Sequence, residues 1–301
     1  MTSSLARPVV VGVDGSLSAL NAVRWGAAEA SRRDRPLRLV TAVDFSSTVA
    51  FGGGFGPPQD FFDQMEIDGR RWLIAAEKAA LQAHPDLTVA RCLRSRTTAT
   101  QSLVEESEHA QLMVLGSRGL GGFAGMLVGS TAVELVARGR CPVVVVRGAE
   151  PDGEIPTTGP VVVGVDGSQA SEAATALAFE EASMRCADLV AVHTWVEFFS
   201  DSAYAHGSQL GMDWKAIEDT EAGQLAERLA GWQEKYPDVT VRRIVTRDRP
   251  VRCLLEHAAD AQLLVVGSRG HGQVSGMLLG STSRALIYHA PCPLLVARPG
   301  S

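Results

Sequence analysis

The chain has 301 residues, about twice the length of a common domain, so two domains are expected. Its hydrophobic share of 46%, charged share of 21% and net charge of −6 are typical of globular proteins and exclude a basic nucleic-acid footprint. None of the three lysines follows a glycine-rich turn, which excludes a Walker-type phosphate loop.

The cysteines and the apolar runs indicate the compartment. The five cysteines include no Cys-x-x-Cys pair, so neither a disulfide framework nor a zinc site is indicated. No apolar run approaches the roughly 18 residues that a membrane span requires, and the first residues lack the apolar core of a signal peptide. We therefore expect a cytoplasmic protein with no membrane span and no nucleic-acid partner.

The predicted elements of the first half alternate between short apolar strands and longer amphipathic helices. Ser16 or Ser18 is the expected N-cap of the first helix. Strict alternation predicts a parallel sheet with helices on both faces. In chain order the expected elements are strand Val9–Val13, helix Leu17–Arg33, strand Leu37–Val43, helix Asp63–Ala83, strand Leu87–Leu93, helix Thr100–Ala110, strand Leu112–Gly116, helix Ser130–Arg138 and strand Val143–Arg147.

The second half of the chain repeats the first. VVVGVDGS occurs at residues 9–16 and again at 161–168. The copies lie 152 residues apart at Asp14 and Asp166 but 151 apart at Gly116 and Gly267, so one residue was gained or lost in between. A period this long predicts a duplicated domain. We expect domains at 1–148 and 160–301, joined by a linker at 149–159 that is rich in Pro, Gly and acidic residues.

A spaced set of glycines follows the strand Leu112–Gly116. The segment Gly116–Gly119 is followed by nine residues and then by Gly129–Thr131, which opens a helix. Glycines allow a close approach of the backbone, and a helix N-terminus offers unpaired amides to phosphate oxygens. The pattern predicts a phosphate site that needs no lysine; the alternative is a flexible loop before an ordinary helix cap. Its recurrence at Gly267–Gly270 and Gly280–Thr282 favours the phosphate site.

Asp14 and Asp166 follow the first strand of each half and precede Gly-Ser. Ligands of such sheets bind beyond the carboxyl ends of the strands, so one interpretation is a contact with adenine or ribose. The alternative is an Asx turn leading into the helix, which Asp-Gly-Ser forms by itself. The glycine-rich segment ends beside the same strand, and this position favours the ligand contact.

The pattern Gly-x2-Gly-x9-Gly-[Ser/Thr], with Val-Asp-Gly-Ser closing the first strand, resembles the ATP-binding class of the universal stress protein family. The tandem arrangement is similar to that of two-domain members common in actinobacteria. The resemblance covers both halves and implies α/β domains with doubly wound, five-stranded parallel sheets of order 3-2-1-4-5, each binding ATP alone or with Mg²⁺. By position it implies ligand contacts at Gly12, Asp14, Ala42, Gly116, Arg118, Gly119, Gly122, Gly129, Ser130 and Thr131, and at Gly164, Asp166, Thr194, Gly267, Arg269, Gly270, Gly272, Gly280, Ser281 and Thr282.

We therefore expect an ATP-binding regulator of stress response or growth that forms a homodimer and acts on an unidentified protein partner. Each site has one Asp and no lysine, so at most slow hydrolysis is expected. One alternative is a phosphoryl- or adenylyl-transfer enzyme on the same fold; another is a dimerisation module with an empty pocket. A bulky residue at Gly116 or Gly267 is expected to abolish ATP binding with the fold retained.

Overall fold

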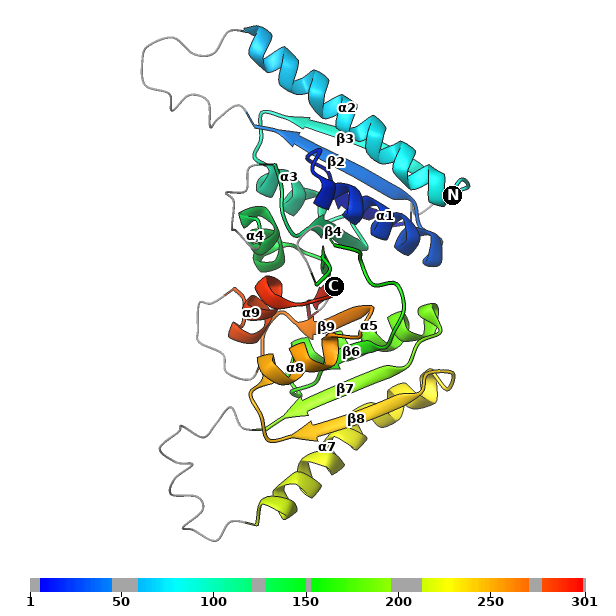
Figure 1. Cartoon of the computed structure of the whole chain (residues 1–301), viewed down its shortest axis with the longest axis vertical. Helices are drawn as coiled ribbons and strands as arrows, with labels where there is room; N and C mark the ends of the chain where they lie inside the picture. The colour runs from blue at the N-terminus through cyan, green and yellow to red at the C-terminus, as the bar shows by residue number, and fades with distance from the viewer. Residues whose placement is uncertain are drawn as a thin grey trace, which may run out of the picture. The chain divides into compact units, whose positions relative to one another are not determined.

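The computed structural model describes residues 6–44, 59–120, 128–149, 153–195, 213–270 and 278–299. The chain separates into two compact units that divide between Ile155 and Pro156 (Figure 1). Each unit consists of a parallel sheet covered by helices, as the alternation of strands and helices in the sequence predicts.

In the first unit, the sheet has the strand order β3-β2-β1-β4-β5 and every pairing is parallel. The strand order reverses at β1, which pairs with both β2 and β4. Helix α1 packs on α2, and α3 packs on α4 (Figure 1). The elements are β1 (Val9–Gly12), α1 (Leu17–Arg32), β2 (Leu37–Val43), α2 (Gln59–Ala83), β3 (Val89–Ser95), α3 (Ala99–Glu106), β4 (Leu112–Gly116), α4 (Ser130–Arg138) and β5 (Val143–Val146).

The sheet of the second unit has the strand order β8-β7-β6-β9-β10, again with parallel pairs. Counted within each unit, both sheets have the order 3-2-1-4-5, which confirms the predicted fold class. The elements are β6 (Val161–Gly164), α5 (Gln169–Arg185), β7 (Leu189–Thr194), α7 (Trp214–Lys235), β8 (Val241–Thr246), α8 (Pro250–Ala258), β9 (Leu263–Gly267), α9 (Ser281–His289) and β10 (Leu294–Ala297).

The central strands are buried on both faces and form the core of each unit. All four residues of β1 and all four valines of β5 are buried, so these strands show no alternation of apolar and polar side chains. Helix α1 covers the sheet with small side chains, among them Ala22, Ala27 and Ala30, each fully buried. In the second unit the fully buried Phe179 ring stacks on Trp232, with the ring centroids 6.2 Å apart.

Some element boundaries differ from the predicted ones. The helix expected to run to Ala110 ends at Glu106, because the chain turns there and the Ser107 hydroxyl donates to the Val104 carbonyl at 2.6 Å. The third strand begins at Val89 because the preceding residues form a turn between His84 and Leu87. Helix α2 begins four residues earlier than expected, at Gln59.

The one-residue difference between the copies lies in the turn between β3 and α3. The strands β3 and β8 still correspond at the longer offset, since Val89 and Val241 pair with equivalent residues. From α3 and α8 onward the shorter offset holds. Arg96, in the turn that is one residue longer, has a φ of 63°, in the left-handed region that non-glycine residues seldom adopt.

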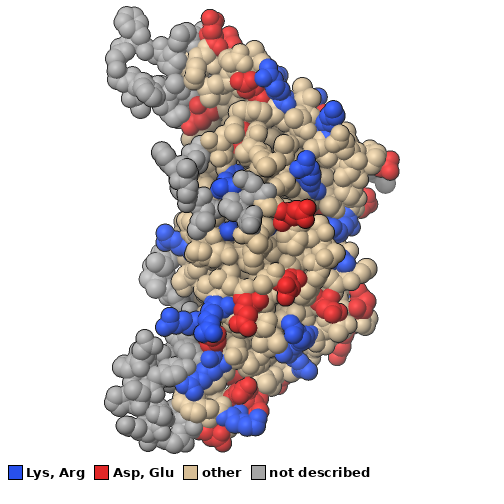
Figure 2. Space-filling view, in the orientation of Figure 1, with Lys and Arg blue, Asp and Glu red and all other residues tan. Residues whose placement is uncertain are grey.

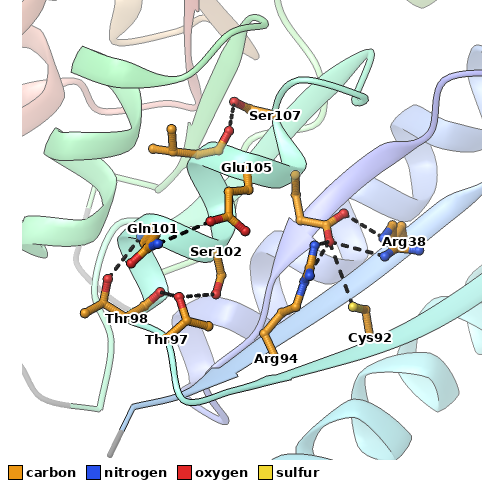
Figure 3. Close-up of polar contacts among 11 residues, drawn as sticks. Arg38, Cys92, Arg94, Thr97, Thr98, Gln101, Ser102, Glu105 and Ser107 are labelled. Carbon is orange, nitrogen blue, oxygen red and sulfur yellow. Dashed lines mark hydrogen bonds and ion pairs between the residues drawn. The ribbon is translucent and has the colours of Figure 1, made fainter. Parts of the chain in front are cut away.

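Glu106 joins α3 to two strands of the sheet through Arg38 and Arg94, which Figure 3 labels. Its carboxylate accepts hydrogen bonds from Arg38 Nε at 2.8 Å and from Arg94 Nη2 at 2.6 Å. The Glu106 side chain is 7% exposed, and those of Arg38 and Arg94 are 35% and 40% exposed. Burial alone would raise the pKa of the Glu106 carboxyl, but the hydrogen bonds from Arg38 and then from Arg94 outweigh it, so this pKa lies below its ordinary value.

We expect Glu106→Gln to lower the free energy of unfolding of the first unit by about 1 to 3 kcal/mol at neutral pH. A carboxyl group whose folded pKa is depressed contributes stability above its unfolded pKa of about 4.3, and loses that contribution as the pH falls through the folded pKa. The difference between variant and wild type should therefore shrink below about pH 4 in urea unfolding experiments. Glu105→Gln, at an exposed neighbouring position, is the control with equal charge change. A difference that persists unchanged in acid would contradict this role.

Gly116 and Gly267, which end β4 and β9, lie against the first turn of a helix. An added Cβ at Gly116 would lie 2.7 Å from the Ser18 backbone, and one at Gly267 would lie 2.7 Å from the Ala170 backbone. These contacts are too short, so a bulky residue at either position carries a cost in stability that the sequence alone does not show. We expect Gly116→Val and Gly267→Val each to destabilise their unit by about 1 to 3 kcal/mol.

Thermal denaturation measures this cost. Gly223→Ala is the matched control, because an added Cβ there would meet nothing within 4 Å. Alanine in a helix interior should hold or slightly raise the unfolding temperature. If both valine variants unfold at the wild-type temperature, α1 and α5 move aside without loss of stability, and the prediction is wrong.

Candidate functional site

Each unit has a cavity at the carboxyl ends of its central strands, where the strand order reverses. The cavity of the first unit has a volume of about 270 Å³, and that of the second about 230 Å³. The first lies between the ends of β1, β2 and β4 and the start of α4; the second lies at the equivalent place. This is the position at which open α/β sheets bind their ligands.

The described residues of the predicted site all line these two cavities. They are Gly12, Asp14, Ala42, Gly116, Arg118, Gly119, Gly129, Ser130 and Thr131 in the first unit, and Gly164, Asp166, Thr194, Gly267, Arg269, Gly270, Gly280, Ser281 and Thr282 in the second. The other two predicted positions, Gly122 and Gly272, lie outside the described residues.

The helix that starts at each cavity has no side-chain cap. Gly129 is the N-cap of α4 and Gly280 that of α9, and neither helix has a side-chain capping hydrogen bond. By contrast, Ser16 caps α1 and Ser168 caps α5 through their hydroxyl groups. The first amides of a helix are unpaired within it and carry a partial positive charge. A glycine cap therefore leaves these donors to a ligand.

A backbone hydrogen bond holds each of these helix starts against the strand end. The Gly129 amide donates to the Ser117 carbonyl at 2.8 Å, and the Gly280 amide donates to the Ser268 carbonyl at 2.9 Å. The residues after β4 and β9 thus lie directly beside the helix N-terminus. The same geometry occurs twice, at the equivalent place in both units.

The Asp14 carboxylate ties the β1–α1 turn to the glycine-rich segment. Its Oδ1 accepts from the Ser16 amide at 3.0 Å and from the Ser16 hydroxyl at 2.7 Å. These bonds form the Asx turn that was one of the two interpretations of Asp-Gly-Ser. Its Oδ2 accepts from the Leu120 amide at 3.0 Å. In the second unit, Asp166 Oδ1 accepts from the Ser168 amide at 2.9 Å. Both carboxylates line a cavity and also have a structural role.

The other end of each cavity is apolar. Val13, Val40 and Leu103 line it in the first unit, and Val165, Val192 and Leu254 in the second. An apolar end opposite a set of amide donors suits a ligand with a flat apolar part and an anionic part.

The two units fix this apolar end with different side chains. The Thr41 hydroxyl donates to the Val13 carbonyl at 2.9 Å, whereas His193 Nδ1 lies 2.7 Å from the Val165 carbonyl. The His193 Nε2 lies 3.1 Å from a carboxylate oxygen of Glu221. The histidine thus has the structural role at the strand end that its position before Thr194 suggests.

Several wall residues are missing from the sequence-based site. Ala99 and Leu103 of α3, and Pro250 and Leu254 of α8, line the cavities. Their spacing of four residues places each pair on one helix face, which is the signal available in the sequence. That this face meets the cavity follows from tertiary packing alone.

The cationic groups of the site are arginines. Arg118 and Arg269 line the cavities, while the three lysines lie in α2 and α7. Over the described ranges, no group of three His, Cys, Asp or Glu side chains is placed to hold a metal ion. Basic and acidic side chains are interspersed on the face shown in Figure 2. Within the same ranges, none of the helices is both long and apolar enough to cross a membrane.

Comparison with known proteins identifies the family of both units. The model of the universal stress protein family matches residues 6–147 and again residues 157–298. A universal stress protein of Mycobacterium tuberculosis is 43% identical over 295 residues, which cover 96% of each chain. One of Mycolicibacterium smegmatis is 41% identical over 298 residues, with 97% of each chain covered.

A solved structure supports the same assignment at the level of the fold. The crystal structure of a universal stress protein from Archaeoglobus fulgidus matches with a TM-score of 0.67 and 18% identity, and covers 97% of this chain and 98% of that one. The duplicated motifs, the strand order and the sequence relatives agree. The chain belongs to the universal stress protein family, as a tandem two-domain member.

Proposed function

We propose that each unit binds ATP and that the protein uses nucleotide occupancy to regulate a protein partner in stress response or growth control. The observation that carries the proposal is the uncapped helix N-terminus, at Gly129 and again at Gly280, beside a cavity with an apolar far end. The amides and Arg118 or Arg269 would hold the phosphates, and the apolar end would hold the adenine. The cavities, of about 270 and 230 Å³, are slightly smaller than the roughly 300 Å³ at which typical ligand pockets begin, so each has room for no more than one nucleotide.

The same geometry argues against rapid turnover. A phosphoryl-transfer enzyme needs a positioned base and cations around the transferred group. The Asp14 carboxylate accepts three hydrogen bonds from protein groups, which tie it to the β1–α1 turn and to the glycine-rich segment. Mg²⁺, if present, would be held by the phosphates and water. We propose at most slow hydrolysis.

The cellular setting is part of the proposal. All five cysteines are free thiols, which fits a reducing cytoplasm. We also propose a homodimer as the functional assembly, and nucleotide-dependent exposure of a surface that a partner protein binds.

We expect purified protein to retain nucleotide, or to bind two ATP per chain when it is added. Heat or acid denaturation followed by anion-exchange chromatography identifies what is released. Isothermal titration with ATP then counts the sites. If the protein releases no nucleotide on denaturation and binds no ATP in the titration, the proposal is contradicted.

Substitutions at the two cap glycines test the phosphate site directly. An added Cβ at Gly129 would lie no closer than 3.9 Å to its nearest neighbour, and one at Gly280 no closer than 3.4 Å, so a β-carbon meets no clash at either position. We expect Gly129→Asp to lower ATP affinity of the first site at least about 100-fold, because like charges about 4 Å apart at an effective dielectric constant of 20 repel by up to about 4 kcal/mol. The fold should be retained, since Asp is a favourable N-cap.

Two matched variants separate the causes. Gly129→Ala adds a methyl group and leaves the amides free, so its effect should be small. Gly129→Asn engages the amides as a neutral cap and should weaken binding less than Asp. The Gly280 series should act in the same way on the second site, and the double Asp variant should bind no ATP. Equal affinities across Ala, Asn and Asp would contradict a phosphate at these helix ends.

A further inference from the structure

A buried histidine beside the second cavity has a hydrogen-bond acceptor at each of its ring nitrogens. His193 is 7% exposed and lies in β7, directly before Thr194, which lines the cavity. Its Nδ1 lies 2.7 Å from the carbonyl oxygen of Val165, another lining residue, and its Nε2 lies 3.1 Å from a carboxylate oxygen of Glu221 in α7. The ring therefore connects the cavity wall to helix α7.

Only the doubly protonated ring satisfies both contacts. A carbonyl oxygen only accepts hydrogen bonds, and so does an ionised carboxylate. A neutral imidazole has one N–H group, so its other nitrogen would present a lone pair to an oxygen. The imidazolium ion has two N–H groups and donates to Val165 and Glu221 at once. Histidine rings change between these two states over the range of about pH 5 to 8.

The first unit has a counterpart that does not titrate. Thr41 takes the place of His193, and its hydroxyl donates to the Val13 carbonyl at 2.9 Å. Gly69 of α2 takes the place of Glu221: a Cβ added there would lie 3.3 Å from Thr41 Cγ2, so the same helix position faces the same strand position in both units. The second unit thus has a proton-dependent link between helix and cavity wall that threonine and glycine do not form.

Glu221 is the charged partner of His193 in the described part of the chain, and its side chain is partly buried. The residue of β8 that pairs with His193 is the uncharged Val245. Along α5 the first buried charged residue is Glu181, near the end of the helix. The elements around the ring carry further charged side chains at Glu218 and Arg228 of α7, Asp166 after β6, Arg243 of β8 and Arg247 after β8. Within the described residues, none of these is ion-paired with His193, so its proton controls the Glu221 contact.

Loss of the proton disfavours a bound anion in two ways. If the remaining proton is on Nε2, the Nδ1 lone pair faces the Val165 carbonyl at 2.7 Å, and the cavity wall must move. If it is on Nδ1, the hydrogen bond to Glu221 is lost. In both cases the Glu221 carboxylate loses its cationic partner, which leaves one more net negative charge near the cavity. Nucleotide binding and protonation of the ring should therefore strengthen each other.

We propose that His193 is a positioning residue of the second site: its imidazolium ion holds the Val165 wall to Glu221 of α7, so this site binds nucleotide more tightly at pH 6 than at pH 8. The first site, with Thr41 at the equivalent position, lacks this contribution. The inference rests on the proposed function, because the affinity that it concerns is that for nucleotide. The protonation of the ring is measured without any ligand.

Nitrogen NMR of the histidine side chains tests the link in the ligand-free protein. The His193 signals are assigned by their loss in His193→Thr. We expect both ring nitrogens to carry protons at pH 6 and one of the two protons to be lost as the pH rises to 8. A ring whose protonation stays constant between pH 5 and 9 would overturn the proposal.

ATP affinities at two pH values test the effect on the site. In the Gly129→Asp protein, which keeps the second site, affinity is measured by titration at pH 6 and pH 8. The ratio of the two affinities is compared with that of the same protein carrying His193→Thr, which cancels the titration of ATP itself. We expect the ratio to be about fivefold higher with His193, the equivalent of one net hydrogen bond.

Glu221→Gln separates the proton-dependent link from a merely structural role. The glutamine amide can donate to Nε2 of a neutral ring whose Nδ1 keeps its proton for Val165. This variant should bind ATP at both pH values, with a ratio as low as that of His193→Thr. Glu218→Gln, at an exposed position one turn earlier in α7, changes the charge equally and should keep the higher ratio.

The outcomes distinguish this inference from the proposed function. Equal ratios with and without His193, in protein that binds ATP, would overturn the inference and leave the proposed function standing. A ratio in Glu221→Gln that stays as high as in Glu218→Gln would overturn the role of Glu221. No ATP binding in otherwise wild-type protein would overturn the proposed function and, with it, the effect of His193 on affinity.

Discussion

The proposed nucleotide site depends on one arrangement of backbone groups: a helix whose first amides are left uncapped, held beside the end of a buried strand. Gly129 supplies no capping side chain, and its amide bond to the Ser117 carbonyl fixes the helix start. Because the donors are backbone amides, no lysine is needed, and the chain has none at either cavity. The sheet order brings β1 beside β4, so the turn that holds Asp14 lies at the same edge of the sheet.

Much of the fold, namely the order and bounds of the strands and helices, could be predicted from the sequence, because these follow from local periodicity. The strands Leu37–Val43 and Leu112–Gly116 and the helix Ser130–Arg138 lie where the apolar pattern predicts them. The glycine spacing likewise identified residues that line the cavities. What it could not supply was the contribution of α3 and α8, since nothing local says which helix face meets a ligand. The loss of stability caused by a side chain at Gly116 also depends on its distance to Ser18, which only the tertiary structure gives.

Duplication has kept the backbone of the site and changed its side chains. Among the differences, the serine at Ser18 has moved by one residue to Ser171, Ala42 and Ala132 are replaced by Thr194 and Ser283, and Thr41 is replaced by His193. None of these changes alters the strand order, and Ser171, Ser283 and His193 each make a hydrogen bond that the residue at the equivalent position of the first unit does not make. Glu106 is a further difference, since it binds α3 to the sheet in the first unit and has His257 as its counterpart in the second.

A crystal structure of the protein with a non-hydrolysable ATP analogue tests the central claim most directly. We expect phosphate oxygens within about 2.7 to 3.2 Å of the first amide nitrogens of α4 and α9, with the base at the apolar end of each cavity. A triphosphate bound elsewhere, or helix ends that close on their own side chains in crystals grown with saturating nucleotide, would contradict it.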